Sequence, residues 1–160
     1  MTVLELTRTG DRRVYTLEGI GTLRLEGVMS RAATAMAGGA SWTIGRRGFW
    51  QRAIEAVDES GSPVGTFEPR TVRRGGILTW AGREFTLRPA SSFRERYALA
   101  DGDRELALLD GKGWSKRPVK VTVDESEAVE PGLLLFAAFV VRGLAEDAGS
   151  AAAAGATAAT

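Results

Sequence analysis

The chain of 160 residues contains neither cysteine nor histidine. Without cysteine, the protein has no disulfide bonds, zinc–thiolate sites or thiol nucleophiles. Without histidine, it has no Ser-His-Asp or Cys-His catalysis, no histidine metal ligation and no ordinary near-neutral general base. Catalysis would have to rest on carboxylates, Tyr, Ser, Arg or Lys. We therefore predict that the protein is not an enzyme and that it uses no metal or other cofactor.

A strong net charge and an export signal are also missing. The net charge is only +1, which gives no overall attraction for nucleic acids, so we expect no nucleic-acid partner. The first residues, "MTVLELTRTGDRR", have neither the basic start nor the apolar segment of a signal peptide. We predict a cytoplasmic protein, and its 44% hydrophobic and 26% charged residues suit one domain with a substantial core.

The charge is unevenly distributed along the chain. Arg142 is the only basic residue beyond Lys120, whereas six acidic residues lie there. Residues 1–123 therefore carry a charge of +6 and the remainder −5. A basic body of this kind indicates an anionic partner.

Short segments in which apolar and polar residues alternate fill most of the chain, as in half-buried strands. Turn formers such as Asp101-Gly102 and Asp110-Gly111 separate them. The predicted strands cover residues 14–19, 22–27, 41–45, 50–58, 63–68, 77–82, 83–88, 94–101, 104–110 and 118–124. The segment "SRAATAMAGGA", residues 30–40, is ambiguous, because Ala and Met favour a helix whereas its glycines and flanking strands favour an extended segment. We predict a strand there.

One segment near the end, "EPGLLLFAAFVVRGLAED", is apolar without interruption from Leu133 to Val141. Pro131 suits a first helical position, and Glu127 and Glu130 suit the positive end of a helix. A membrane-spanning helix needs about 20 apolar residues, and Arg142 interrupts this one too soon. A helix that is apolar on every face lies inside a protein. We predict a core helix over about residues 131–147, with a buried strand as the lesser alternative.

Ten to twelve strands followed by one apolar helix indicate a closed antiparallel barrel wide enough to hold that helix. We therefore predict a mostly β domain over residues 1–147, with about twelve strands around a buried C-terminal helix. The Ala-rich tail, residues 148–160, is predicted to be disordered.

The segment "RPVKVTVDESEAVEPGLLLFAAFVVRGLAED" resembles the tubby C-terminal-like superfamily, which includes LURP-one-related proteins and phospholipid scramblases. Its order is a Val-x-Val strand, an acidic link, an apolar helix and further acids. The hairpins "DESGSPVGTFEP" and "ADGDRELALLDGKGW" are also similar to that superfamily's strand–turn–strand units. The resemblance covers roughly residues 14–147 and implies a twelve-stranded barrel around a hydrophobic helix.

The resemblance also implies two kinds of ligand. Scramblases bind calcium shortly before their helix, and "DESEAVEPG" stands in the corresponding place here. It lacks the regularly spaced oxygen ligands and the central Gly of a calcium loop, so we interpret its acids as partners of the helix N-terminus. Tubby proteins bind phosphoinositide headgroups with basic residues, but those positions have no residue-by-residue match in this chain.

The segment "GKGWSKRPVK" contains all three lysines of the chain and is the predicted binding site. Its cations can pair with lipid phosphates while the indole lies at the membrane interface. The alternative is an ordinary solvated hairpin with the Trp packed on the barrel. The candidate headgroup-binding residues are Lys112, Trp114, Lys116, Arg117 and Lys120.

Two further segments have the same ambiguity, namely the basic turn "EPRTVRRGG" (residues 68–76) and "GRRGFWQR" (residues 45–52). Nucleotide-binding motifs fail, because "GIGTLR" has Arg24 in place of the third Gly and "DGKGW" lacks the spacing of a phosphate loop. We predict a non-catalytic binding module that recognises anionic phospholipid at the membrane periphery. The alternative is a soluble protein-interaction or scaffold domain with a protein partner.

Overall fold

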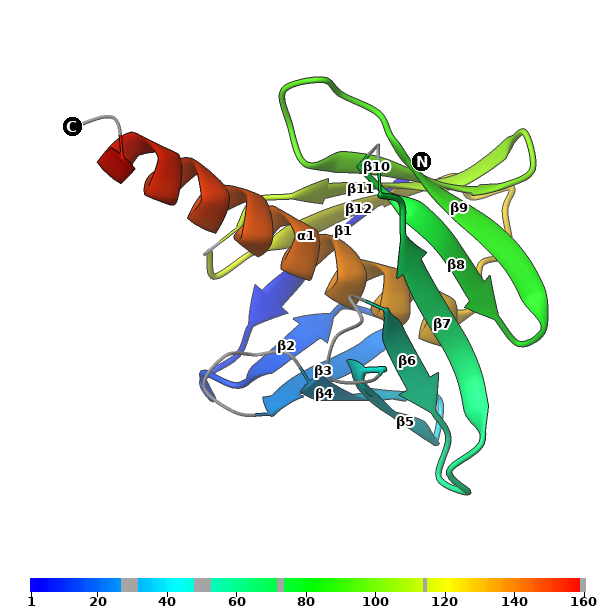
Figure 1. Cartoon of the computed structure of the whole chain (residues 1–160). Coiled ribbons are helices and arrows are strands. Elements are labelled where there is room, and N and C mark those ends of the chain that lie inside the picture. Colours follow the sequence, from blue (N-terminus) through cyan, green and yellow to red (C-terminus); the bar gives the residue numbers. More distant parts are fainter. Residues whose placement is uncertain (27–31, 48–52, 72–73, 114, 159–160) are drawn as a thin grey trace.

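A computed structural model describes residues 1–26, 32–47, 53–71, 74–113 and 115–158. Within them twelve strands precede one helix, α1 (Pro131–Ala158) (Figure 1). The strands are β1 (Thr2–Arg8), β2 (Val14–Leu17), β3 (Gly21–Glu26), β4 (Ala32–Ala37), β5 (Ala40–Arg46), β6 (Ile54–Val57), β7 (Pro63–Pro69), β8 (Gly76–Trp80), β9 (Arg83–Pro89), β10 (Arg96–Asp101), β11 (Arg104–Gly111) and β12 (Val119–Val123).

The strands form a closed antiparallel barrel in which each strand pairs with its neighbours in sequence. The barrel closes where β1 pairs with β12, with Leu4 opposite Val121 and Leu6 opposite Val119. Closure leaves none of the twelve described strands at an unpaired sheet edge. The predicted fold class, a mostly β barrel of twelve strands with one C-terminal helix packed against it, is confirmed.

Strand alternation directs the apolar residues inward. Leu23 and Leu25 of β3 are buried while Arg24 between them is exposed, and Val119 and Val121 of β12 are buried on either side of Lys120. A barrel of this strand number leaves a space inside that side chains alone do not fill.

Helix α1 occupies that space. Every side chain of residues 133–141 is at most 5% exposed, so this part of the helix is buried on all faces. It contacts strands around the whole wall, including β3, β4, β7, β10, β11 and β12. Figure 1 shows α1 running through the barrel, with its last turns projecting beyond the strands. The predicted core helix is confirmed, and its apolar surface on all sides is the physical reason for its position.

The ambiguous segment at residues 30–40 forms strand β4 within its described part. The inward side chains Ala33, Ala35 and Ala37 are all buried, whereas Met36 between them points outward and is 54% exposed. The small side chains of these alanines therefore let α1 approach this wall of the barrel closely.

Two Trp side chains hold the helix at the barrel entrance. The Trp80 ring centroid lies 5.6 Å from that of Trp42 and 5.7 Å from that of Phe136, and Trp80 Nε1 donates a hydrogen bond of 2.8 Å to Glu130. A Cβ atom on Gly132 would come within 2.5 Å of Trp80. Glycine at the start of α1 is thus required for this close packing.

Two parts of the structure differ from the sequence-based expectation. The first is β1, which is not among the strands that the alternation predicts. The second is the end of the helix, since α1 continues to Ala158 where residues 148–160 were predicted to be disordered. Alanine has the highest helix propensity, so the Ala-rich segment extends a helix that the barrel has already nucleated. Among the described residues, no helix is long and apolar enough to cross a bilayer.

The position of the helix can be tested by comparing two Phe→Ala substitutions. Phe136 is fully buried, whereas Phe93 is 99% exposed. Phe136→Ala is expected to lower the free energy of unfolding by about 3–5 kcal/mol, because it leaves a cavity in the core. Phe93→Ala serves as the matched control and is expected to change stability by less than about 0.5 kcal/mol. Equal effects of the two substitutions in chemical denaturation would contradict a helix inside the barrel.

Candidate functional site at the basic end of the barrel

The two ends of the barrel carry opposite charge. Because neighbouring strands run antiparallel and follow one another in sequence, alternate connections lie at the same end. We call the end where α1 enters the acidic end and the end where it leaves the basic end.

The connections at the acidic end comprise residues 18–20, 38–39, 58–62, 81–82, 102–103 and 124–130, and they contain no Lys or Arg. Arg83 and Arg104, at the starts of β9 and β11, pair with acids here, since Arg83 lies 2.6 Å from Asp101 and Arg104 lies 3.6 Å from Glu127. The acidic residues of these connections are Glu18, Asp58, Glu59, Asp103, Asp124, Glu125, Glu127 and Glu130.

The connections at the basic end have the reverse composition in their described parts. Their only acids are Asp11 and Glu95. Their basic residues are Arg12, Arg13, Arg47, Arg70, Arg74, Arg94, Lys112, Lys116 and Arg117. Charge is therefore separated along the barrel axis in a molecule whose net charge is close to zero.

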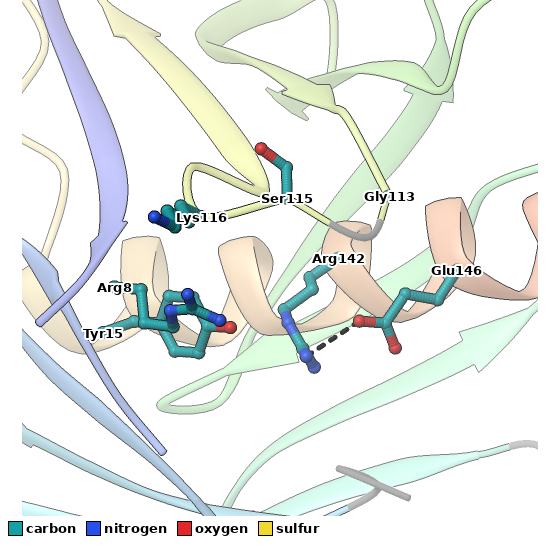
Figure 2. A pocket seen from close by; sticks show the side chains of 7 residues that line it. All are labelled: Arg8, Tyr15, Gly113, Ser115, Lys116, Arg142 and Glu146. Atoms are coloured by element: carbon teal, nitrogen blue, oxygen red, sulfur yellow. Dashed lines mark ion pairs between the residues drawn. The ribbon is translucent and has the colours of Figure 1, made fainter. Parts of the chain in front are cut away.

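A cavity of about 280 Å³ opens at the basic end, between the β11–β12 hairpin and α1. Figure 2 shows the cations of Arg8, Lys116 and Arg142 around it, together with the carboxylate of Glu146. Tyr15, Gly113 and Ser115 complete the lining. Three cations and one acid give the cavity a net positive charge.

Backbone hydrogen bonds position the cationic residues of this cavity. The Arg8 N–H donates to the Lys116 carbonyl at 2.8 Å, which joins the end of β1 to the β11–β12 hairpin. The hairpin itself is closed by a bond of 2.7 Å from Lys112 N–H to the Pro118 carbonyl. Arg8 and Lys116 are therefore held at one mouth of the barrel by the fold.

Arg142 brings a guanidinium group into the cavity from the helix. The residue is only 4% exposed, and its Nη2 lies 2.8 Å from Glu146 Oε1, one turn further along α1. Its Cζ lies 5.5 Å from the centre of the Tyr15 ring, within range of a cation–π interaction. Its buried Nε makes no hydrogen bond within the described part of the protein. Arg142 thus lines the cavity with a buried guanidinium group, one of whose N–H donors has no partner among the described residues.

Glu146 limits the positive charge of the cavity. Burial raises the pKa of its carboxyl group, the nearby Arg142 opposes that rise, and Asp147 adds to it. Desolvation therefore outweighs the attraction between the two partners, as is common for buried ion pairs. When Glu146 is protonated, the cavity has only cations.

The structure separates the predicted site residues. Lys116 lines the cavity, whereas Lys112 and Arg117 pair with Glu5, at 3.9 Å and 3.2 Å respectively. Lys120 lies on the outer wall of β12, opposite Glu5 and Asp110 in the neighbouring strands. Trp114 lies outside the described residues.

The two further basic segments singled out in the sequence lie partly outside the described residues. In the turn at residues 68–76, Arg74 takes part in a polar network with Glu95, while Val72 and Arg73 lie outside the described residues. Phe49 and Trp50 of the segment at residues 45–52 also lie outside them.

The acidic link before the helix forms local bonds. Asp124 accepts hydrogen bonds from the backbone and side chain of Ser126, Glu125 accepts one from Thr2, and Glu130 accepts the one from Trp80. Across the described residues, no group of three or more Asp, Glu, His or Cys side chains comes together to hold a metal ion.

Sequence reasoning missed Arg8, Tyr15, Arg142 and Glu146 as members of the site. Arg142 was interpreted only as the residue that interrupts the apolar segment. The charge separation can be found from the sequence once the strands are assigned. Alternate connections of a sequential antiparallel barrel lie at the same end, so the charges of each set can be summed to give the charge of each end. Dividing the chain at residue 123 concealed this pattern.

No protein-family model, curated protein sequence or solved structure matches this chain significantly. The resemblance to the tubby C-terminal-like superfamily therefore stays a prediction.

The raised pKa of Glu146 predicts a pH dependence of stability. The ordinary value is 4.5, and the folded-state pKa lies above it. The neutral carboxyl group therefore contributes to the free energy of unfolding. This contribution is fully present below the unfolded-state pKa and is lost as the pH rises through the folded-state pKa. Glu146→Gln has no proton to lose in this range, so the stability of the unsubstituted protein relative to this variant should fall as the pH rises above about 4.5. Parallel thermal denaturation across this range measures the difference, and a difference that is constant or grows with pH would contradict the assignment.

Proposed function

We propose that this protein is a non-catalytic binding module that recognises anionic phospholipid headgroups at a membrane surface through its basic end. The observation that carries the proposal is the separation of charge between the two barrel ends. Basic residues gathered on one face attract an anionic leaflet with about 1 kcal/mol each near the surface. The acidic end orients the molecule by repulsion, so one face is presented to the membrane.

The cavity supplies a place for one headgroup. Small-molecule sites usually enclose about 300–1,000 Å³, and the cavity, at about 280 Å³, lies just below that range. This size suits a phosphate-bearing headgroup and not a whole lipid. The Arg142 guanidinium can bind phosphate oxygens with parallel N–H donors, and Lys116 adds a mobile point charge.

In this proposal the protein is peripheral to the membrane, and the barrel stays folded in the bound state. The affinity combines a headgroup bound in the cavity with the longer-range attraction of the surrounding arginines. The second contribution is screened by salt, because the Debye length falls from about 10 Å at 0.1 M to about 3 Å at 1 M.

Charge reversal at each end tests the proposal. Lys116→Glu should weaken binding to mixed phosphatidylcholine–phosphatidylserine or phosphoinositide vesicles by about tenfold or more, because it changes the charge at the cavity by two. Arg83→Glu changes the net charge of the protein equally but lies at the acidic end, in an exposed pair with Asp101. This control should bind vesicles like the unsubstituted protein.

Co-sedimentation at several salt concentrations provides the measurement. Binding should weaken as salt rises, and Lys116→Glu should reduce the salt dependence. Failure of the unsubstituted protein to bind anionic vesicles at low salt would contradict the proposal and favour the protein-interaction alternative. Equal losses in Lys116→Glu and Arg83→Glu would show that net charge, and not the basic end, controls binding.

A further inference from the structure

Among the described residues, one exposed large apolar side chain stands on the basic end of the barrel. Phe93, in the β9–β10 loop at residues 90–95, is 99% exposed. The other exposed large apolar residues of the described chain, Met1, Val3 and Met36, lie toward the acidic end. Single exposed apolar residues are common on protein surfaces, so exposure alone assigns Phe93 no role.

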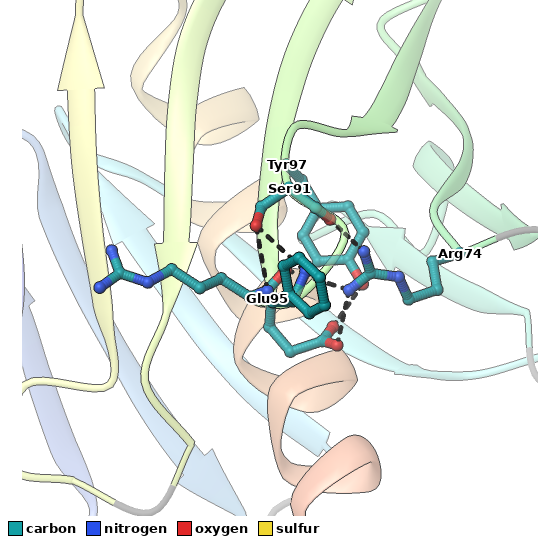
Figure 3. A network of polar contacts seen from close by, with 6 residues as sticks. Arg74, Ser91, Glu95 and Tyr97 are labelled. Carbon is teal, nitrogen blue, oxygen red and sulfur yellow. Dashed lines mark hydrogen bonds and ion pairs between the residues drawn. The ribbon is translucent and has the colours of Figure 1, made fainter.

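The loop is braced by hydrogen bonds on both sides of Phe93. The Ser91 hydroxyl accepts hydrogen bonds from the backbone N–H groups of Phe93 and Arg94, at 3.2 Å and 3.1 Å. Arg74, from the β7–β8 connection, donates to the carbonyls of Ser91 and Arg94 and pairs with Glu95 at 3.0 Å (Figure 3).

Glu95 connects this loop to its neighbours. Its carboxylate accepts a hydrogen bond from the Tyr97 hydroxyl, and its carbonyl accepts one of 2.7 Å from Gly111 N–H at the end of β11. Burial, together with the bond to Glu95, raises the pKa of Tyr97, so its hydroxyl remains a donor at any physiological pH. The loop that carries Phe93 is thus fixed directly beside the basic hairpin at residues 112–118.

The hydrogen bonds within this loop reduce the cost of moving its backbone from water into contact with lipid. Backbone N–H and C=O groups without partners are costly to remove from water. In the β9–β10 loop, the Ser91 hydroxyl and the Arg74 guanidinium satisfy several of these groups from within the protein. The tip can therefore enter a less polar layer, while the charge of Arg94, the next residue, remains at headgroup level.

The end of α1 is compatible with an orientation in which the basic end of the barrel faces the membrane. Residues 148–158 continue the helix on this side of the barrel and contain no charged residue. Their length of about 16 Å would bring them into the headgroup layer of a membrane facing the basic end. These residues bring no side-chain charge into that layer, although the C-terminal end of the helix carries a partial negative charge.

We infer that the β9–β10 loop inserts Phe93 into the interfacial layer of an anionic membrane while the cationic cavity and its surrounding basic residues bind headgroups. This inference rests on the proposed function, and it assigns an apolar part of the attachment to Phe93. Aromatic side chains favour the membrane interface, and an exposed Phe loses its contact with water on insertion.

The test compares Phe93→Ala with Met36→Ala, which removes an exposed apolar side chain toward the opposite end. Phe93→Ala should weaken binding to mixed phosphatidylcholine–phosphatidylserine vesicles by about tenfold, because apolar contact area is lost. It should leave the salt dependence of binding unchanged, whereas Lys116→Glu reduces it. Met36→Ala should bind vesicles like the unsubstituted protein.

A soluble probe separates this inference from the proposed function. Binding of inorganic phosphate, measured by calorimetry, should be the same in Phe93→Ala and in the unsubstituted protein, because Phe93 does not line the cavity. Undiminished vesicle binding by Phe93→Ala would overturn the inference and leave the proposed function standing. Phosphate binding without vesicle binding in the unsubstituted protein would overturn both the proposed function and the inference, and would identify a free phosphate as the ligand. Binding of neither probe would overturn the proposed function, and the inference with it.

Discussion

The structure depends on one constraint, which is that the interior of a twelve-stranded barrel must be filled. Side chains from the wall do not reach across such a space, so a separate apolar element has to occupy it. Residues 133–141 meet this requirement, because they are buried on every face. The Ala side chains inside β4 and the glycine at position 132 follow from the same requirement, since each lets the helix or its Trp neighbours approach closely.

The helix that fills the barrel also distinguishes the two ends of the molecule. Because the helix follows β12, it enters at the end where the connections are acidic and leaves where they are basic. Its first turn therefore has its positive dipole end among carboxylates, which is the favourable arrangement. At the exit, Arg142 and Glu146 form a buried ion pair beneath the β11–β12 hairpin. The packing of the core thus places a buried guanidinium in the cavity that we propose binds headgroups.

Much of the fold could be predicted from the sequence, and less of the site. Period-two alternation and turn residues are local signals, so most strands and the core helix were predictable. β1 is not among the strands that the alternation predicts, and the low-complexity Ala-rich segment predicts disorder although it continues the helix to Ala158. The cavity depends on contacts between distant residues, such as the bond from Arg8 N–H to the Lys116 carbonyl, which no local pattern encodes. Lys116 was found because a cluster of lysines is visible in the sequence, whereas Arg142 is a single charge in an apolar segment.

The central claim is that the filled barrel presents its basic end, and not its acidic end, to an anionic membrane. The absence of cysteine allows a single fluorophore to be attached at either end, through Ala90→Cys in the β9–β10 loop or Ala128→Cys in the acidic link. Both alanines are exposed. On mixed phosphatidylcholine–phosphatidylserine vesicles, an environment-sensitive label at residue 90 should shift to the blue and be quenched by lipid-borne quenchers, while the label at residue 128 should remain as in buffer. Equal responses at both positions, or a response at residue 128 alone, would contradict the account.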